Sequence, residues 1–338
     1  PESAPRGGVR SESVSFESSP ASARHRASLC PDHGLPAPRS LAAGRTLPPR
    51  PPLGLRRLWF LDGRKMALWS ESSRRRLKRE TQAISQSLAP HIPRSCTHVR
   101  GHGGVKGALR QIHRRLPKAR FVARFDIAAY YTSMRHDVIE AQVKEAGLGT
   151  HHRKLIADYL ALPDMRDTGQ GMVASGGLSP LLGALYLTPL DRRMDRLCKG
   201  KRLVHYVRYM DDLVLLARTR WQLRRAIAAL HEEITPLRLR LHRVKRFIGR
   251  TTQGFDFLGY RIRAGARLRP SAEGLRRLRE RARRLYEREG DWQRLRQYVL
   301  RWWRWHLGGL DGMVRWKGGV KRTWHHVCTH LAGKHPPG

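Results

Sequence analysis

Residues 206–217 read YVRYMDDLVLLA, a stretch in which two adjacent carboxylates lie between two apolar runs. Burying two like charges is costly unless a metal ion, an arginine or solvent at a turn compensates them. The pattern predicts a strand, a tight turn that carries Asp211 and Asp212, and a second strand. Because successive strand residues point to opposite faces, one aspartate can enter a site while the other lies close by.

A third carboxylate occurs in a similar setting. Asp126, in the segment RFDIAAYY, follows a predicted strand that contains Val122 and Phe125. Two strands that end side by side with carboxylates would form a hard-oxygen site suited to Mg²⁺. Two such ions about 3.5–4 Å apart can stabilise the attacking and leaving oxygens of phosphoryl transfer. The alternative is a solvated turn whose aspartates pair with Arg208 and Arg218.

The charge of the chain indicates its partners. The 338 residues include 67 Lys and Arg against 27 Asp and Glu, a formal net charge of +40. Such a balance favours a nucleic-acid backbone, because each neutralised phosphate releases counterions. An anionic membrane surface is the rival partner, but no apolar run approaches about 18 residues, so we expect no membrane span. The four cysteines form no CxxC pair and suggest neither a zinc site nor a disulfide framework, as in a reduced cytoplasmic protein.

Composition divides the chain into three parts. Residues 1–55 are rich in Ser, Pro, Arg, Ala and Gly and are predicted to be a disordered basic leader. The first methionine is Met66, which raises the hypothesis that part of this leader is not native. Strands alternate with helices over about 58–265, and an Arg-rich helical tail follows. Ser179 and Pro180 predict the N-cap and the first residue of a helix.

Several motifs occur in an order that resembles a known family. YMDD lies in an apolar hairpin, FDIAAYYTSM and GMVASGGLSPLLGALYL precede it, and RLRLHRVKRFIG and GFDFLGYRI follow it. Together with CTHVRGHGGVKGALRQI, they resemble a bacterial reverse transcriptase, an RNA-directed DNA polymerase of the group II intron-like, standalone retroelement or defence type. The resemblance covers roughly residues 64–330, and the shared order is more specific than any single motif.

The resemblance implies an α+β fold, a right-hand polymerase with an antiparallel palm sheet followed by an all-helical thumb. The implied parts are reduced fingers at 56–120, a palm with catalytic motifs and primer grip at 121–265, and an Arg-rich thumb and tail at 266–338. Thumb arginines suit the backbone of a template–primer duplex. Trp302, Trp303 and Trp305 could stack bases, but the packing habit of such residues favours a small helical core.

The resemblance also implies roles for individual residues. Asp126 and Asp211 would hold Mg²⁺, with Asp212 beside them. Tyr131 matches an aromatic gate that excludes the ribose 2′-OH, with a core tyrosine next to Tyr130 as the alternative. The remaining implied residues are Lys245 near the triphosphate, which could instead be a solvated cation; Gly176, Gly177, Arg64 and Lys65 for nucleotide binding; and Phe257, Leu258, Gly259 and Tyr260 in the primer grip.

The sequence departs from the family pattern at two places. Val173, Ala174 and Ser175 replace the usual Pro-Gln-Gly, which puts fidelity or substrate choice in doubt. A start at Met66 would remove Arg64 and Lys65 from the fingers. An RNase H domain or an HNH endonuclease is not expected after the thumb, which favours a compact standalone enzyme by analogy.

The implied activity is RNA-templated DNA synthesis from dNTPs at a primer 3′-OH, on a primer–template duplex, with a possible non-coding RNA partner. The alternative is an RNA-binding, maturase-like protein with little or no polymerase activity. A third possibility, an RNA-dependent RNA polymerase, is weakened by Tyr131. The sequence leaves open the template, the primer, the biological role and the oligomeric state.

Overall fold

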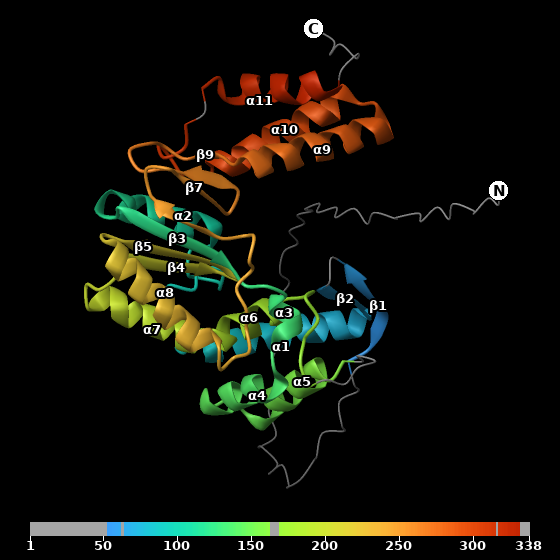
Figure 1. Ribbon diagram of the computed structural model, residues 1–338. Coiled ribbons are helices and arrows are strands. Elements are labelled where there is room, and N and C mark those ends of the chain that lie inside the picture. Colours follow the sequence, from blue (N-terminus) through green and yellow to red (C-terminus); the bar gives the residue numbers. More distant parts are fainter. Residues whose placement is uncertain (1–52, 62–63, 163–168, 316, 332–338) are drawn as a thin grey trace, which may run out of the picture. The chain divides into compact units, whose positions relative to one another are not determined.

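The computed structural model of the protein describes residues 53–61, 64–162, 169–315 and 317–331 (Figure 1). All of them belong to one compact unit, Pro51–Gly338. Almost the whole predicted leader, 1–52, lies outside the described residues. No helix within the described part of the chain is long and apolar enough to cross a membrane.

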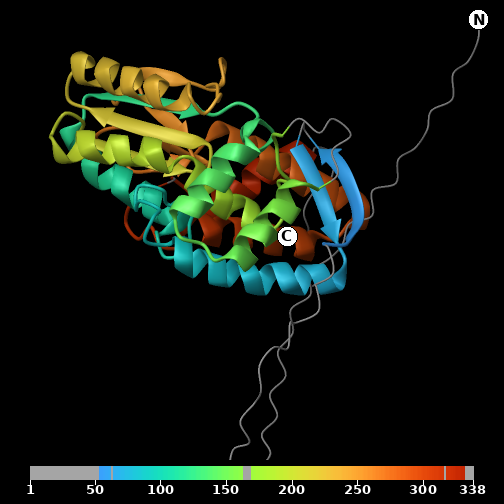
Figure 2. The same ribbon diagram turned by 90° about the horizontal axis from the view of Figure 1, so that it is seen from below.

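The N-terminal part combines a hairpin with a group of helices. Strand β1 pairs antiparallel with β2, and α1 begins directly after the hairpin, with the Ser70 side chain accepting a hydrogen bond from the Ser73 backbone N–H. Figure 2 shows the hairpin at one end of α1. These elements are β1 (Leu55–Leu61), β2 (Arg64–Trp69), α1 (Glu71–Leu88), α3 (Tyr130–Ser133), α4 (His136–Glu145), α5 (Thr150–Leu160) and α6 (Leu178–Tyr186).

Helix α6 begins two residues earlier than the sequence predicts. Its N-cap is Gly177, so the prediction that Ser179 caps the helix is wrong. The Ser179 side chain is fully buried, donates a hydrogen bond to the Val173 carbonyl and is bonded to the Tyr159 hydroxyl. A buried hydroxyl needs a hydrogen-bond partner. Ser179 therefore holds the loop before α6 through Val173 and Tyr159 and does not cap the helix.

Within the described residues, the central sheet has four antiparallel strands in the order β4-β5-β3-β6. Side chains alternate across it. One face, with Phe125 and Leu213, contributes to the main core and is covered by α7 and α8 (Figure 1). The other face, with Val122 and Val214, packs against α2. The bounds are α2 (Gly104–Arg115), η1 (Leu116–Lys118), β3 (Phe121–Asp126), α7 (Thr188–Lys199), β4 (His205–Tyr209), β5 (Asp212–Ala217), α8 (Arg220–Ile234) and β6 (Phe247–Arg250).

A small second sheet and a helical tail complete the described chain. The tail helices bury their own cluster around Leu278, Leu295 and Val299, against which Trp302 packs. Trp303 is buried, whereas Trp305 is half exposed. Core packing therefore describes Trp302 and Trp303 but not Trp305. The elements are β7 (Phe255–Phe257), β8 (Tyr260–Ile262), β9 (Arg269–Pro270), α9 (Ala272–Glu289), α10 (Trp292–Leu307), α11 (Gly319–Cys328) and η2 (Thr329–Leu331).

Candidate active site

The register of the central sheet places two carboxylates opposite each other. Strand β3 pairs with β5 so that Asp126 is the direct partner of Asp212. Directly opposed residues of an antiparallel pair project from the same face, with Cβ atoms about 4.5–5.5 Å apart. Asp211 lies in the turn between β4 and β5, and its carbonyl accepts a hydrogen bond from the Ile127 N–H at 3.1 Å. The structure therefore gathers all three aspartates at one end of the sheet, with Asp212 rather than Asp211 facing Asp126.

Two cations contact these carboxylates. Arg124 Nη2 lies 2.6 Å from Asp212 Oδ1, and Lys245 Nζ lies 3.7 Å from Asp126 Oδ2. Burial raises the pKa of Asp212 above its ordinary value, Arg124 lowers it and the charge of Asp126 raises it again. In the sequence-based alternative of a solvated turn, the aspartates pair with Arg208 and Arg218. In the structure Asp212 pairs with Arg124, and Arg208 pairs with Asp191.

The turn that carries Asp211 is strained. Tyr209 pairs with Asp212 across a two-residue loop, and Met210 adopts φ +56°, in the left-handed region that favours glycine. A residue held in such a conformation needs support from its surroundings, and strain of this kind clusters at functional sites. The Met210 N–H donates to His98 Nδ1 at 3.0 Å, and the Met210 carbonyl accepts from Arg208 Nη1 at 3.1 Å.

A buried ion pair supports this turn from below. Arg208 and Asp191 both have fully buried side chains and form a two-point contact, with Arg208 Nε 2.8 Å from Asp191 Oδ1. The Tyr206 hydroxyl donates to the same oxygen at 2.7 Å, and Arg208 also donates to the Ala184 carbonyl. Such a pair is stable only when further hydrogen bonds satisfy both ions, as they do here.

His98 links the turn to helix α6. Its Nε2 lies 2.9 Å from the Pro180 carbonyl, while its Nδ1 accepts from Met210. This arrangement requires the neutral ring with its proton on Nε2. Burial lowers the pKa of His98 to about 4 and keeps the ring neutral at ordinary pH. Sequence reasoning missed His98, Arg208 and Asp191 as supporting residues, because their partners lie far away in sequence or on another element.

Lys245 reaches the site because its segment runs along the end of β3. The His242 N–H donates to the Asp126 carbonyl at 2.7 Å, and the Ala128 N–H donates to the Arg240 carbonyl at 2.8 Å. These bonds bring the bend that contains Lys245 beside Asp126, although the lysine side chain is 61% exposed. The structure thus brings Lys245 beside Asp126, and its role at the triphosphate remains a prediction.

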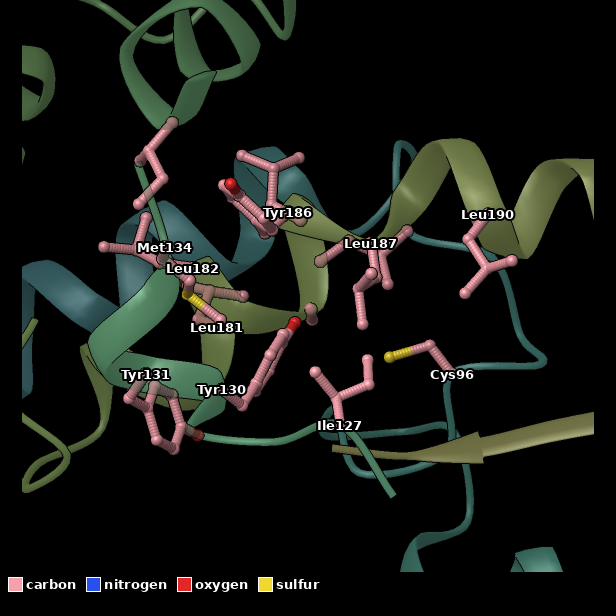
Figure 3. Packing of buried hydrophobic residues seen from close by; sticks show 14 of the residues in the cluster. Cys96, Ile127, Tyr130, Tyr131, Met134, Leu181, Leu182, Tyr186, Leu187 and Leu190 are labelled. Atoms are coloured by element: carbon pink, nitrogen blue, oxygen red, sulfur yellow. The ribbon is translucent and has the colours of Figure 1, made fainter. Parts of the chain in front are cut away.

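Tyr131 lies in the main core. It is 7% exposed, and its ring packs against Tyr130 with centroids 5.5 Å apart. Figure 3 shows both tyrosines on the short helix α3, with Tyr130 directed toward α6 and Tyr131 at the edge of the cluster. The Tyr130 hydroxyl donates to the Gly183 carbonyl. This packing agrees with the core alternative for Tyr131, while the gate role remains a prediction.

Gly176 and Gly177 line a separate pocket of about 730 Å³ between α1 and α6. Gly176 adopts φ +105°, which a residue with a Cβ rarely does, and Gly177 approaches Thr81. His98 lines the same pocket and connects it to the Met210 turn. Arg64 and Lys65 begin strand β2, but their side chains lie outside the described residues.

The predicted primer grip is a tight hairpin. Phe257 pairs with Tyr260, and Leu258 and Gly259 both have positive φ, as a two-residue type I′ turn requires. Phe257 and Tyr260 are buried. The Tyr260 hydroxyl donates to the His306 carbonyl at 2.9 Å and accepts from Lys106 Nζ at 2.6 Å.

Lys106 ties three elements together. From α2 its ammonium also donates to the Trp305 and His306 carbonyls near the end of α10, and it lies 4.3 Å from the Trp305 ring centroid. Burial lowers the pKa of Lys106 to about 8. The predicted primer-grip hairpin is thereby fixed to both α2 and the helical tail, and contact with a primer remains a prediction.

The carboxylates fit a divalent cation by their donor chemistry. Carboxylate oxygens are the ligands that Mg²⁺ prefers, and the Asp126 and Asp212 side chains are 14% and 21% exposed, so solvent reaches both. The ligand atoms of the three aspartates do not all lie within 4.8 Å of one another. Among the described residues, only Glu80, His151 and His152 bring three possible ligand atoms within 4.8 Å of one another.

Comparison with known proteins gives one family. Residues 71–262, more than half of the chain, match the model of the family described as reverse transcriptase (RNA-dependent DNA polymerase). No curated protein matches the chain significantly.

Three solved telomerase structures are similar to part of the chain. Apo telomerase of Candida tropicalis truncated from the C-terminal domain is 12% identical, with 56% of this chain and 43% of that chain covered and a TM-score of 0.42. Candida albicans telomerase with a fragment of telomeric RNA is 10% identical, with 76% of this chain and 47% of that chain covered and a TM-score of 0.45. Apo telomerase of Candida tropicalis is 8% identical, with 76% of this chain and 55% of that chain covered and a TM-score of 0.48. The chain spans about half the length of these structures.

The family match and the fold agree. The helices and antiparallel sheets described above confirm the predicted α+β polymerase fold. The chain belongs to the reverse transcriptase (RNA-dependent DNA polymerase) family.

Proposed function

We propose that the protein is an RNA-templated DNA polymerase, a nucleotidyltransferase that adds dNTPs to a primer 3′-OH. The observation that supports this most strongly is the direct pairing of Asp126 with Asp212 at the end of two strands, beside the turn that carries Asp211. The net charge of +40 supports a polyanionic template and primer.

The three aspartates would hold divalent ions, and their donor chemistry suits Mg²⁺. Such ions would supply stabilisation of the attacking and leaving oxygens of phosphoryl transfer. Arg124 and Lys245 hold positive charge against Asp212 and Asp126, which limits repulsion between the carboxylates. His98 and Arg208 fix the backbone of the Met210 turn and so set the position of Asp211. Lys245, at the solvent-exposed edge, would meet the triphosphate.

The finer assignments belong to the same proposal. Motif order supports a bacterial enzyme of the group II intron-like, retroelement or defence type. The Arg-rich helices α9 and α10 support binding of an RNA–DNA duplex and of a dedicated non-coding RNA. The division into fingers, palm and thumb belongs to the proposal as well: the predicted fingers contain β1, β2, α1 and α2, the predicted palm contains the central sheet, and the predicted thumb contains α9, α10 and α11.

The experiment uses the purified full chain, a primed RNA, dNTPs and Mg²⁺. We expect primer extension that falls by about 100- to 1000-fold in Asp126→Asn and Asp212→Asn, the scale on which loss of one preorganised electrostatic group acts. Asp137→Asn, at an exposed aspartate on α4, is the matched control and should extend normally. Equal extension by the site variants and the wild type would refute the site. An RNA-binding protein that incorporates no nucleotide, even as wild type, would indicate the maturase-like alternative.

A further inference from the structure

A buried acid interrupts the apolar face of helix α1. The residues of α1 that point inward include Leu77, Glu80 and Ile84. The Glu80 side chain is 8% exposed, and carboxylates are almost never this buried unless they are paired. This position is remote in sequence from the aspartates of the candidate active site, and the mechanism proposed above does not use it.

Two adjacent histidines of α5 face this acid. Glu80 Oε2 lies 3.3 Å from His151 Nε2 and 3.5 Å from His152 Nε2. The other carboxylate oxygen, Oε1, accepts from Arg79 at 3.1 Å. The carboxylate therefore divides its contacts, with one oxygen toward an exposed arginine and the other toward the two imidazoles.

The distances distinguish two kinds of contact. Good N–H···O hydrogen bonds measure about 2.9–3.0 Å, so contacts of 3.3 and 3.5 Å are long for this purpose. A tetrahedral zinc site with metal–ligand distances of about 2.0–2.1 Å has ligand–ligand edges of roughly 3.3–3.4 Å. The spacing between the carboxylate oxygen and each imidazole nitrogen is thus that of two ligands on one ion.

The exposure of the two histidines also suits a cation. His151 is 45% exposed and His152 23% exposed, which gives an ion a path from solvent and leaves space for water as a fourth ligand.

We propose that Glu80, His151 and His152 form a binding site for a transition-metal ion of the Zn²⁺ class that links α1 to α5. Two imidazoles and one carboxylate suit Zn²⁺ better than Mg²⁺, which prefers oxygen ligands alone. The cysteine pattern gives no indication of this site, because none of its ligands is a thiol. The inference does not rest on the proposed polymerase function.

The site lies on a helix that positions the glycine pocket. Further along α5, the Tyr159 hydroxyl donates to the Ser175 carbonyl at 3.1 Å and contacts Ser179 at 2.6 Å, and its ring stacks on Trp69. An ion that joins α5 to α1 would therefore restrict the movement of the loop that contains Gly176. Its effect would be structural, expressed as stability.

The test measures Zn²⁺ bound to the purified, metal-stripped full chain by competition with a chromogenic chelator and by elemental analysis after gel filtration. After gel filtration, we expect wild type to retain one equivalent of Zn²⁺ more than Glu80→Gln or His152→Gln. In the chelator competition, the affinity of this site for Zn²⁺ should be at least about 100-fold lower in each variant than in wild type. His231→Gln, at an exposed histidine on α8, is the matched control and should bind as wild type does. Co²⁺ in place of Zn²⁺ should give a visible ligand-field absorption that the variants lack.

Stability provides a second readout. Because an ion that binds only the folded state stabilises it, saturating Zn²⁺ should raise the Tm of wild type and leave that of Glu80→Gln unchanged. If the Glu80 and His152 variants do not fold, His151→Gln, at the most exposed ligand, keeps the test decisive and should still weaken binding by about 10-fold or more. Zn²⁺ stoichiometry, affinity and Tm shifts that are equal in wild type and variants would overturn the proposal and leave a hydrogen-bonded cluster.

Discussion

His98 accepts a hydrogen bond from the backbone N–H of Met210 at 3.0 Å, across 112 residues of sequence. The bond supports a non-glycine residue at φ +56° directly before Asp211. The position of that aspartate therefore depends on a neutral imidazole outside the tetrapeptide YMDD.

We expect His98→Phe to reduce primer extension strongly and His98→Asn to reduce it less. Asparagine can present an oxygen where Nδ1 accepts, whereas phenylalanine leaves the Met210 N–H unpaired, at a cost of about 1–3 kcal/mol. Extension rates on the same primed RNA check this, with folding verified by circular dichroism. Equal rates for the two variants would show that the hydrogen bond does not position the turn.

Protonation of His98 should make stability fall in acid. Burial lowers its pKa to about 4 in the folded protein, whereas the unfolded chain has a value near 6.5. The unfolded state then binds more protons between these values, so stability is complete above about pH 6.5 and declines as pH falls toward 4. The contribution of this group is on the order of 3 kcal/mol.

Urea denaturation of wild type and His98→Asn at pH 7 and pH 5 measures this effect. The variant should lose less stability between the two pH values than wild type does. His205 and His306, whose pKa values burial also lowers to about 4, remain in both proteins, so the difference isolates His98. A variant that loses as much stability as wild type would exclude His98 as the source.

Removal of Arg208 should be strongly destabilising. Arg208→Met leaves Asp191 as a buried, uncompensated charge, and breaking such a pair typically costs about 3–5 kcal/mol. The double variant Arg208→Met with Asp191→Leu should recover much of this stability, because an apolar pair of similar volume is tolerated. Primer extension should stay low in the double variant, since the bond to the Met210 carbonyl is gone. Denaturant midpoints and extension rates separate the two effects.

Tyr131→Ala should increase the use of ribonucleotides if the ring acts as a gate. The ratio of kcat/KM for dNTP to kcat/KM for NTP should fall by about 10- to 100-fold. This is the scale on which one steric contact in a binding pocket discriminates between substrates. Tyr131→Phe keeps the ring and should retain discrimination. An alanine variant that loses stability but discriminates as wild type does would leave Tyr131 as a core residue only.

Lys245→Ala should raise the KM for dNTPs. A charge-assisted contact to the triphosphate is worth about 1.5–3 kcal/mol, or roughly 10- to 150-fold. Arg243→Ala, at an exposed cation in the same bend, is the control and should change KM little. Steady-state extension at varied dNTP concentration gives both values, and matching KM values for the two variants would show that Lys245 acts only as a surface charge.

The sequence predicted the central hairpin because strand alternation and turn position are local properties. It predicted the approach of Asp126 to the 211–212 turn from the carboxylates at both strand ends and from the order of motifs that resembles the family. It could not predict the partner of Arg208, since Asp191 becomes available only when α7 packs against β4. For the same reason, Ser179 resembled a cap when read locally, whereas in the fold its hydroxyl bonds Val173 and Tyr159. Buried polar networks join distant segments, and no local pattern encodes them.

The contacts of Lys106 have a mechanical consequence. One ammonium group bonds the hairpin at Tyr260 and the last carbonyls of α10, so a swing of the tail helices away from α2 must break these bonds together. Arg110 of α2 also donates to the Gly309 carbonyl at 2.6 Å, and the Tyr260 hydroxyl donates directly to the His306 carbonyl. Replacement of Lys106 by methionine would therefore weaken the attachment of the tail helices and leave these two hydrogen bonds in place.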